Sequence, residues 1–309
     1  MDADPVETLT RRESLQRLGT GGLGAVAGAA WGAPVLQQSV LAADRSLTAG
    51  SRTSPGNGRS LLVVWLEGGC SAVDTWDPKP HALREVGLRE ISTSVPGVSV
   101  SELFPQLAQR MHWVTLLRGL TSDQRYGCAA EDHARARAEW FGSLNGSSQP
   151  SEFAAAVSSI GDQSGPQTLG QRIPDIISRL QQGPTQLLVR QTGFDSHTAH
   201  AESLRLQAAS LDGPLSALLD ELRQTGLWET TTLAVLTEFG RSNPLNAWQG
   251  RDHWGQAFSG LLAGAEIPAG QVRGRTDTSG REVIDDPWTV SQMSRWLADR
   301  ASAEESGRA

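Results

Sequence analysis

The chain has 309 residues, 20% of them charged and 38% hydrophobic, which is ordinary for a globular protein and leaves room for one large α/β domain or two small ones. The formal net charge of -7 excludes the basic surface that nonspecific nucleic-acid binding needs. The arginines are scattered along the chain, so no basic stripe for a membrane surface is present either.

Residues 10–43 have the pattern of an export signal. Arg11 and Arg12 precede a weakly apolar core rich in Gly and Ala, and Leu41-Ala42-Ala43 supplies the small residues that signal peptidase prefers. Paired arginines before such a core are typical of the twin-arginine route, although a surface helix with an arginine pair is the alternative. We therefore expect a mature protein in the periplasm or outside the cell, without a stable membrane anchor. The expected segments are a leader at 1–43, a polar linker at 44–59 and an α/β domain at 60–309.

Apolar runs and helical patterns alternate along the rest of the chain. The apolar runs lie at 60–66, 113–117, 185–190, 231–237 and 258–263, and the helical patterns at 101–111, 129–141, 168–182 and 199–226. This alternation predicts an α/β fold with a mostly parallel sheet and helices on both faces. In such sheets ligands bind beyond the carboxyl ends of the strands, so functional residues are expected directly after the apolar runs.

Acidic residues and histidines do follow these runs. Carboxylate and imidazole groups are the ligands that hold Zn²⁺, Mn²⁺, Mg²⁺ or Ca²⁺ in proteins. Each short motif also occurs by chance, but their recurrence at the ends of four predicted segments favours a metal site. The residues are Asp74, Asp195, His197, Glu238, Asp252 and His253.

Two arginines and two cysteines adjoin these motifs. Arg241 and Arg251 are suited to bidentate binding of phosphate, sulfate or carboxylate oxygens, with surface salt bridges as the alternative. Cys70 and Cys128 form no CxxC pair, which argues against a thiolate zinc site. In an oxidising compartment these two residues are able to form one disulfide, but the sequence does not decide whether they do.

Taken in order, seven segments resemble the domain of unknown function 1501 family, which belongs to the alkaline phosphatase and sulfatase superfamily. The segments are GGCSAVDTWDPKP, VSVSELFPQLA, LLRGLTS, GFDSHTAH, LWETTTLAVLTEFGR, GRDHW and IPAGQVRGRTD. The resemblance spans residues 10 to 280 and implies an alkaline phosphatase-like fold behind a twin-arginine leader. It places the six residues named above around a centre of two divalent ions, Zn or Mn, with Mg or Ca as alternatives.

The chemistry that the resemblance implies is attack on a phosphate or sulfate ester by a hydroxyl that the metals activate, with a polysaccharide as one carrier of such an ester. The nucleophile would be Thr121 or Ser122, with Ser71 as a competitor, and His133 would bind substrate or metal. Neither cysteine begins a Cys-x-Pro-x-Arg sequence, which disfavours the formylglycine chemistry of sulfatases.

The chain also departs from the family pattern. The region between Leu120 and Thr168 is condensed, and residues 288–296 differ from the helix that usually ends the fold. These departures leave an alternative function open, a non-catalytic exported protein of the same fold that binds carbohydrate or a partner protein.

Overall fold

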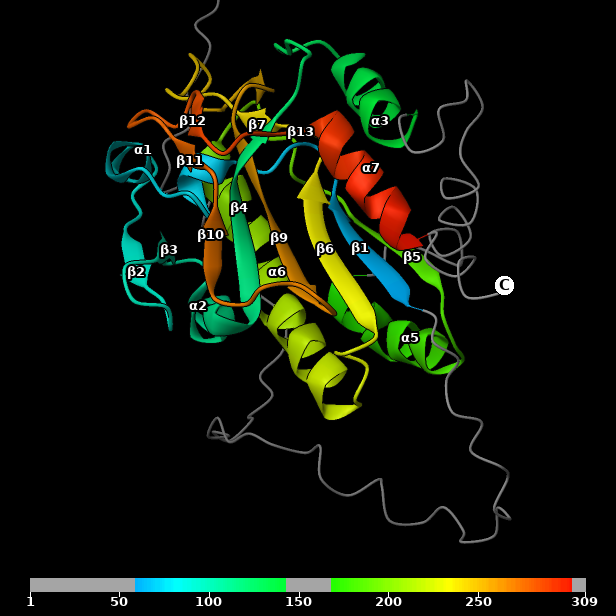
Figure 1. Ribbon diagram of the computed structural model, residues 1–309. Helices are drawn as coiled ribbons and strands as arrows, with labels where there is room; N and C mark the ends of the chain where they lie inside the picture. Colours follow the sequence, from blue (N-terminus) through cyan, green and yellow to red (C-terminus); the bar gives the residue numbers. More distant parts are fainter. Residues whose placement is uncertain (1–58, 143–167, 302–309) are drawn as a thin grey trace, which may run out of the picture. The chain divides into compact units, whose positions relative to one another are not determined.

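The apolar run at 60–66 forms strand β1 (Ser60–Leu66), the second strand from one edge of a seven-stranded sheet (Figure 1). All seven residues of this strand are buried, as expected for a strand covered on both faces. The structure is a computed structural model that describes residues 59–142 and 168–301, all within the unit Thr53–Ala309. The expected leader at 1–43 and nearly all of the linker at 44–59 lie outside the described residues, so export remains a prediction.

The sheet is mostly parallel, as predicted. β1 pairs in parallel with β5 (Gln186–Gln191) and with β6 (Thr231–Thr237). The exception is β9 (Phe258–Gly264), which runs antiparallel to both of its neighbours, β6 and β4 (Val114–Thr121). Two short strands, β10 (Gln271–Arg273) and β13 (Trp288–Thr289), pair with β4 in parallel.

Helices cover both faces of this sheet. Leu62 and Val64 of β1 pack into a cluster with residues of α2 (Pro105–Arg110), α5 (Leu169–Gln181) and α6 (His200–Gln224). The alternate residues Leu61, Val63 and Trp65 pack with α3 (Asp132–Gly142) and α7 (Val290–Ala301) on the opposite face. This alternation follows from the two-residue period of a strand, and the α/β prediction is confirmed.

The remaining elements are short. Three two-stranded antiparallel sheets lie beside the main sheet, together with helix α1 (Pro80–Glu85) and two 3-10 turns at Ala72–Asp74 and Met111–Trp113. The strand pairs are β2 (Glu90–Ser92) with β3 (Ser99–Ser101), β7 (Gly240–Arg241) with β8 (His253–Trp254), and β11 (Arg275–Thr276) with β12 (Val283–Asp285).

Two expectations about helices differ from the structure. The helix predicted at 101–111 begins only at Pro105, because Ser101 is used in β3 and proline is favoured at a first helical position. Asp212 of α6 fixes this start, since its carboxylate accepts the backbone N–H groups of Gln106 (3.0 Å) and Leu107 (2.8 Å). Residues 288–296 were expected to differ from the helix that usually ends the fold. This expectation was wrong, since α7 ends the described part of the fold with a helix.

Both cysteines are free, with Cys70 buried and Cys128 exposed. The disulfide that the sequence left open is therefore not formed. Within the described residues, no helix combines the length and apolar character that crossing a membrane requires.

Helix α6 offers a test of this packing with a matched control. Leu211 is fully buried in the core cluster, whereas Leu206 on the same helix is 69% exposed. We expect Leu211→Ala to lower the free energy of unfolding by about 2–5 kcal/mol, because it removes buried methyl groups and leaves a cavity. Leu206→Ala should change it by less than about 0.5 kcal/mol. Urea denaturation followed by circular dichroism measures both, and equal values would contradict the packing described here.

Candidate metal centre

The candidate site lies just beyond the carboxyl ends of the central strands, where parallel sheets usually bind ligands. Asp195 and His197 follow β5, and Glu238 directly follows β6. His253 begins β8, and His133 lies in the first turn of α3.

Helix α3 is tied to the sheet at this edge. The indole N–H of Trp140 donates to the backbone oxygen of Glu238 (3.0 Å), and the hydroxyl of Ser294 on α7 donates to the backbone oxygen of Trp140 (2.8 Å). These contacts fix the helix that carries His133 against the end of β6.

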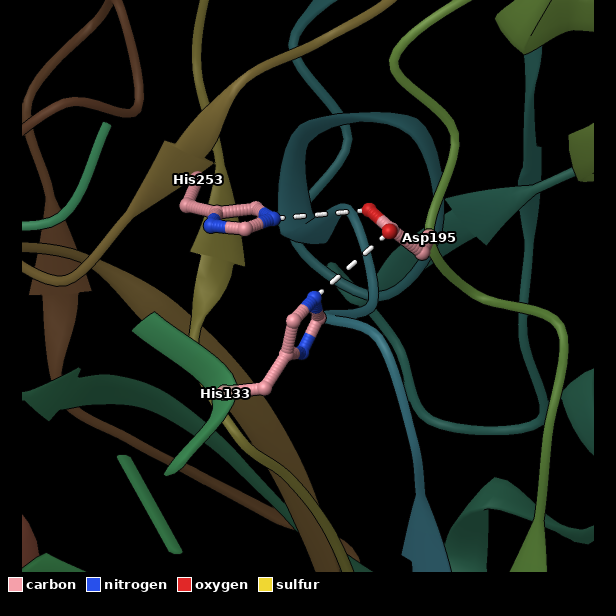
Figure 2. A group of neighbouring side chains, drawn as sticks. All are labelled: His133, Asp195 and His253. Atoms are coloured by element: carbon pink, nitrogen blue, oxygen red, sulfur yellow. Dashed lines mark hydrogen bonds and ion pairs between the residues drawn. The ribbon is translucent and has the colours of Figure 1, made fainter. Parts of the chain in front are cut away.

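Two histidines converge on the carboxylate of Asp195 from different elements (Figure 2). His133 Nε2 lies 3.5 Å from Asp195 Oδ2, and His253 Nε2 lies 3.4 Å from Asp195 Oδ1. One possible ligand atom from each of these three residues lies within 4.8 Å of the others. This group has the residue types and the spacing of a metal site.

A third imidazole completes the group. His197 Nε2 lies 2.9 Å from His253 Nε2 and 3.2 Å from Asp195 Oδ1. Gly250 makes this approach possible, because a Cβ atom at this residue would lie only 1.8 Å from the backbone oxygen of His197. The sequence motifs containing Asp195 and His253, which are distant along the chain, therefore meet.

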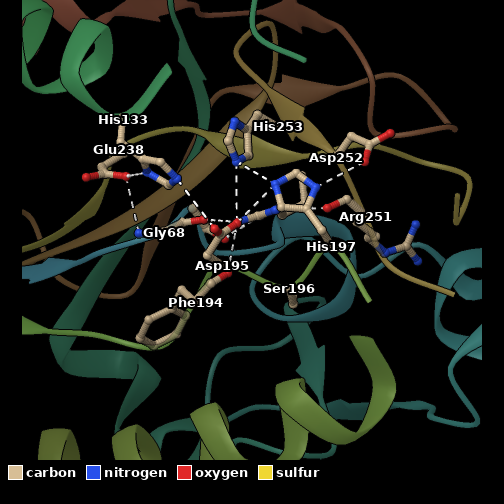
Figure 3. A network of polar contacts seen from close by, with 12 residues as sticks. Gly68, His133, Phe194, Asp195, Ser196, His197, Glu238, Arg251, Asp252 and His253 are labelled. Atoms are coloured by element: carbon tan, nitrogen blue, oxygen red, sulfur yellow. Dashed lines mark hydrogen bonds and ion pairs between the residues drawn. The ribbon is translucent and has the colours of Figure 1, made fainter. Parts of the chain in front are cut away.

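A carboxylate stands behind each of the three imidazoles, and Figure 3 shows Glu238 beside His133 and Asp252 beside His197. The pairs are His133 Nδ1 with Glu238 Oε2 at 2.5 Å, His197 Nδ1 with Asp252 Oδ1 at 3.2 Å, and His253 Nδ1 with Asp132 Oδ2 at 3.2 Å. Metal-binding histidines in proteins usually donate their other ring N–H to a carboxylate or a carbonyl group in this way.

The contacts suit one tautomer of each ring when a cation is bound. In that tautomer Nδ1–H donates to the carboxylate behind the ring and the Nε2 lone pair, which faces Asp195, is available to the cation. Two lone pairs 2.9 Å apart repel each other unless a cation or a proton lies between them. Ligand atoms bound at about 2.0–2.2 Å to one tetrahedral Zn²⁺ lie roughly 3.3–3.6 Å apart. The Nε2 atoms of His133 and His253 lie 3.5 and 3.4 Å from the Asp195 oxygens. The residues therefore fit one divalent cation.

The carboxylates of the site are ionised. Burial by itself raises the pKa of Asp195, but hydrogen bonds with His253 and Arg241 outweigh it and hold the pKa well below its usual range. The same balance lowers the pKa of Asp132, through the N–H of Gly127 and His253. The pKa of Asp252 is also lowered, through Asn246 and His197. These negative charges favour a cation at the centre.

Asp74, predicted from its motif as a metal ligand, instead sits in a buried ion-pair network. Its carboxylate accepts hydrogen bonds from Arg251 (2.7 and 3.0 Å) and Ser71 (2.5 Å), and it lies 2.9 Å from His200 Nε2. Burial raises the pKa of Asp74, but the hydrogen bond to His200 and the charge of Arg251 outweigh it and lower the pKa overall. With both oxygens used inside the protein, Asp74 has a structural role rather than a place among the converging ligands.

The two arginines predicted to bind substrate are buried as well. All N–H directions of Arg251 are taken by Asp74, Asn243 and the backbone oxygen of Ser242, with Glu85 nearby. Arg241 donates to Asp195 (2.6 Å) and to backbone oxygens, including those of Gly69 and Arg251. Both arginines hold loops together, and their burial argues against contact with a substrate.

None of the three predicted nucleophiles forms a hydrogen bond with His133, His197 or His253. The Ser71 hydroxyl is bound to Asp74, and the buried Ser122 hydroxyl donates to Glu139 at 2.6 Å. Thr121 pairs with Thr289 at the end of β4. The hydroxyl groups of Ser71 and Ser122 are therefore occupied elsewhere.

Two residues of the site were not singled out from the sequence. Asp132, whose carboxylate faces His253 Nδ1, directly precedes His133. In the sequence it stands only as part of the short acidic segment Glu131-Asp132-His133. His200 bridges Asp74 and Ser196, with Nδ1 2.6 Å from the Ser196 hydroxyl, and its spacing of four residues from Ser196 was the available signal.

Comparisons with known proteins identify a family. The model of the family described as "Protein of unknown function (DUF1501)" matches residues 58–178 and 176–299. No curated protein sequence matches the chain.

Several solved structures are similar in fold. Ps i-CgsB in complex with a neocarrahexaose is 10% identical, with 80% of this chain and 72% of that chain covered and a TM-score of 0.48. The PsFucS1 sulfatase from Pseudoalteromonas sp. is 10% identical, with coverages of 80% and 68% and a TM-score of 0.44. The C-terminal periplasmic domain of EcEptC from Escherichia coli, in a complex with Zn, is 12% identical, with coverages of 80% and 84% and a TM-score of 0.42. At these values the likeness carries no argument about activity.

The buried network around Asp74 can be tested by removing one charge. We expect Asp74→Asn to lower the free energy of unfolding by about 3–5 kcal/mol, because Arg251 would be left as a buried charge without its partner. Asp220→Asn is the control, since its pair with Arg110 is partly exposed and is worth about 0–1 kcal/mol. Chemical denaturation of both variants measures the difference. A stable Asp74→Asn protein that has lost only metal would instead restore Asp74 as a ligand.

Proposed function

The chain belongs to the DUF1501 family, whose members are described as proteins of unknown function, and from the site of this member we propose a metal-dependent hydrolase of phosphate or sulfate esters. One observation carries the proposal. Three imidazoles with carboxylates behind them turn their Nε2 atoms toward Asp195, at distances that suit one divalent cation.

His133, Asp195 and His253 are the residues that would hold the cation. Three protein ligands with one open position are typical of catalytic zinc sites. Two imidazoles and one carboxylate favour Zn²⁺ or Mn²⁺ over Mg²⁺ and Ca²⁺, which prefer oxygen ligands throughout. When bound, a divalent cation supplies Lewis acidity, which lowers the pKa of water and neutralises charge that develops on an ester oxygen. A second ion, expected from the family resemblance, stays a prediction.

His197 and Asp252 are placed to move a proton. Asp252 fixes the His197 ring by accepting at Nδ1, and Nε2, which lies 2.9 Å from His253 Nε2, would give up that contact to take a proton from an attacking water molecule. The side chain of His197 is 28% exposed and that of Asp252 is 39% exposed, so water reaches this pair from outside. Water as nucleophile also agrees with the engagement of Ser71 and Ser122 elsewhere.

The setting of this activity follows from the sequence. The twin-arginine pattern at residues 10–43 supports work in the periplasm or outside the cell, after export as a folded protein. An ester carried by a polysaccharide is one substrate that such a location would offer.

A second function competes with the first because His197 Nε2 also faces the centre. If His197 is a fourth ligand, the site is closed, as in structural zinc sites. The chain would then be a non-catalytic exported protein with a stabilising metal, which binds carbohydrate or a partner protein.

Two histidine variants separate these functions. Removing the ligand His253 by His253→Ala should abolish both bound metal and hydrolysis of 4-nitrophenyl phosphate or sulfate. His197→Ala should keep the metal but slow hydrolysis by about 100-fold or more, the usual size of a general-base contribution. His112→Ala is the control, because His112 is bonded to Ser94 and lies before the amino end of β4, whereas the site lies beyond the carboxyl ends of the strands.

Metal content by elemental analysis and initial hydrolysis rates before and after chelation are the measurements. Loss of metal from His197→Ala, with no ester hydrolysed by the unaltered protein, would support the closed structural site instead. Hydrolysis that survives both chelation and His253→Ala would contradict a metal-dependent reaction.

A further inference from the structure

The arginines near the centre differ in how far their N–H groups are already used. Arg241 and Arg251 are buried and bonded to backbone and carboxylate oxygens. Arg137 on α3 is different, because its side chain is 41% exposed. Its NH1 atom lies 3.3 Å from Glu238 Oε1 and 3.7 Å from Glu67 Oε1.

Helix geometry brings Arg137 to the site. It follows His133 by four residues, and side chains at this spacing lie on the same face of a helix. Glu238 links the two, since one of its oxygens pairs with His133 and the other faces Arg137. The guanidinium group therefore lies across the buried Glu238 carboxylate from His133, and its side chain is partly exposed.

The contacts of Arg137 are loose and replaceable. Charge-assisted N–H···O bonds are about 2.7–2.9 Å long, so the contacts of Arg137 with these two carboxylates, at 3.3 and 3.7 Å, are longer than a well-formed hydrogen bond. Both carboxylates also have other partners. Glu67 pairs with Arg190, and Glu238 accepts from Gly68 N–H at 3.2 Å as well as facing His133. If Arg137 turns toward a ligand, Glu67 keeps Arg190 and Glu238 Oε2 keeps its contacts with Gly68 and His133, whereas Glu238 Oε1 gives up its contact with Arg137.

We propose that Arg137 binds the non-bridging oxygens of the phosphate or sulfate group of the substrate. A guanidinium group is always charged, and its planar fork matches two oxygens of a tetrahedral anion. The role is recognition of the anionic group rather than proton transfer, so it should affect affinity more than the rate of the chemical step. This inference rests on the proposed hydrolase function for its substrate class.

The test uses the full chain, with inorganic phosphate and inorganic sulfate as probes in titration calorimetry. Arg137→Ala should weaken binding of the probe at least tenfold and raise KM for 4-nitrophenyl esters more than it lowers kcat. Arg137→Lys should retain part of the affinity, because the charge remains while the fork is lost. Arg179→Ala is the matched control, since Arg179 also lies on a helix, is 40% exposed and forms an ion pair with Asp175. Metal content should be the same in all four proteins.

Either of two results overturns the proposal: equal affinity for both anions in the unaltered protein and in Arg137→Ala, or no binding of either anion by the unaltered protein. The failure of the hydrolase function looks different. In that case the protein hydrolyses no ester, yet Arg137→Ala still weakens phosphate or sulfate binding. If esters are hydrolysed with the same KM in Arg137→Ala, only the role of Arg137 fails.

Discussion

The site depends on one electrostatic constraint, the inward direction of three imidazole lone pairs. Glu238, Asp252 and Asp132 each face an Nδ1 atom, and the Nε2 atoms are thereby turned toward an ionised Asp195. Such a cluster carries excess negative charge and mutually repelling lone pairs, so a positive charge at its centre is what stabilises it. The loops beyond the central strands are shaped to bring these groups together.

A second layer of buried charge keeps those loops in place. Asp74 follows β1, Arg251 precedes β8 and His200 begins α6. Inside the protein, the side chains of Arg251 and His200 both bond to the Asp74 carboxylate. Burying ions is expensive unless each has a well-placed partner, and here every carboxylate oxygen and guanidinium edge of the Asp74–Arg251 pair has one. The network costs desolvation and in return joins loops that the sheet alone would leave separate.

Much of this was predictable from the chain, because buried strands are continuous apolar runs and functional residues follow them. The runs that became β1 and β6 and the motifs around Asp195 and His253 were identified in this way. The role of Asp74 was not, since a ligand and a partner of a buried arginine are both acidic residues after a strand. The antiparallel direction of β9 and the start of α2 at Pro105 depend on pairing and on Asp212, which local patterns do not record.

The contact between α7 and α3 has a consequence for the candidate metal centre. Ser294 holds Trp140, Trp140 holds the backbone of Glu238, and the same helix presents His133 to the centre. The last described helix, α7, therefore helps to position His133 through Trp140 and Glu238. Proteolytic removal of α7 would therefore lower the affinity of the site for a cation. A bound cation would in turn stabilise the folded state and slow cleavage of α7 by a protease.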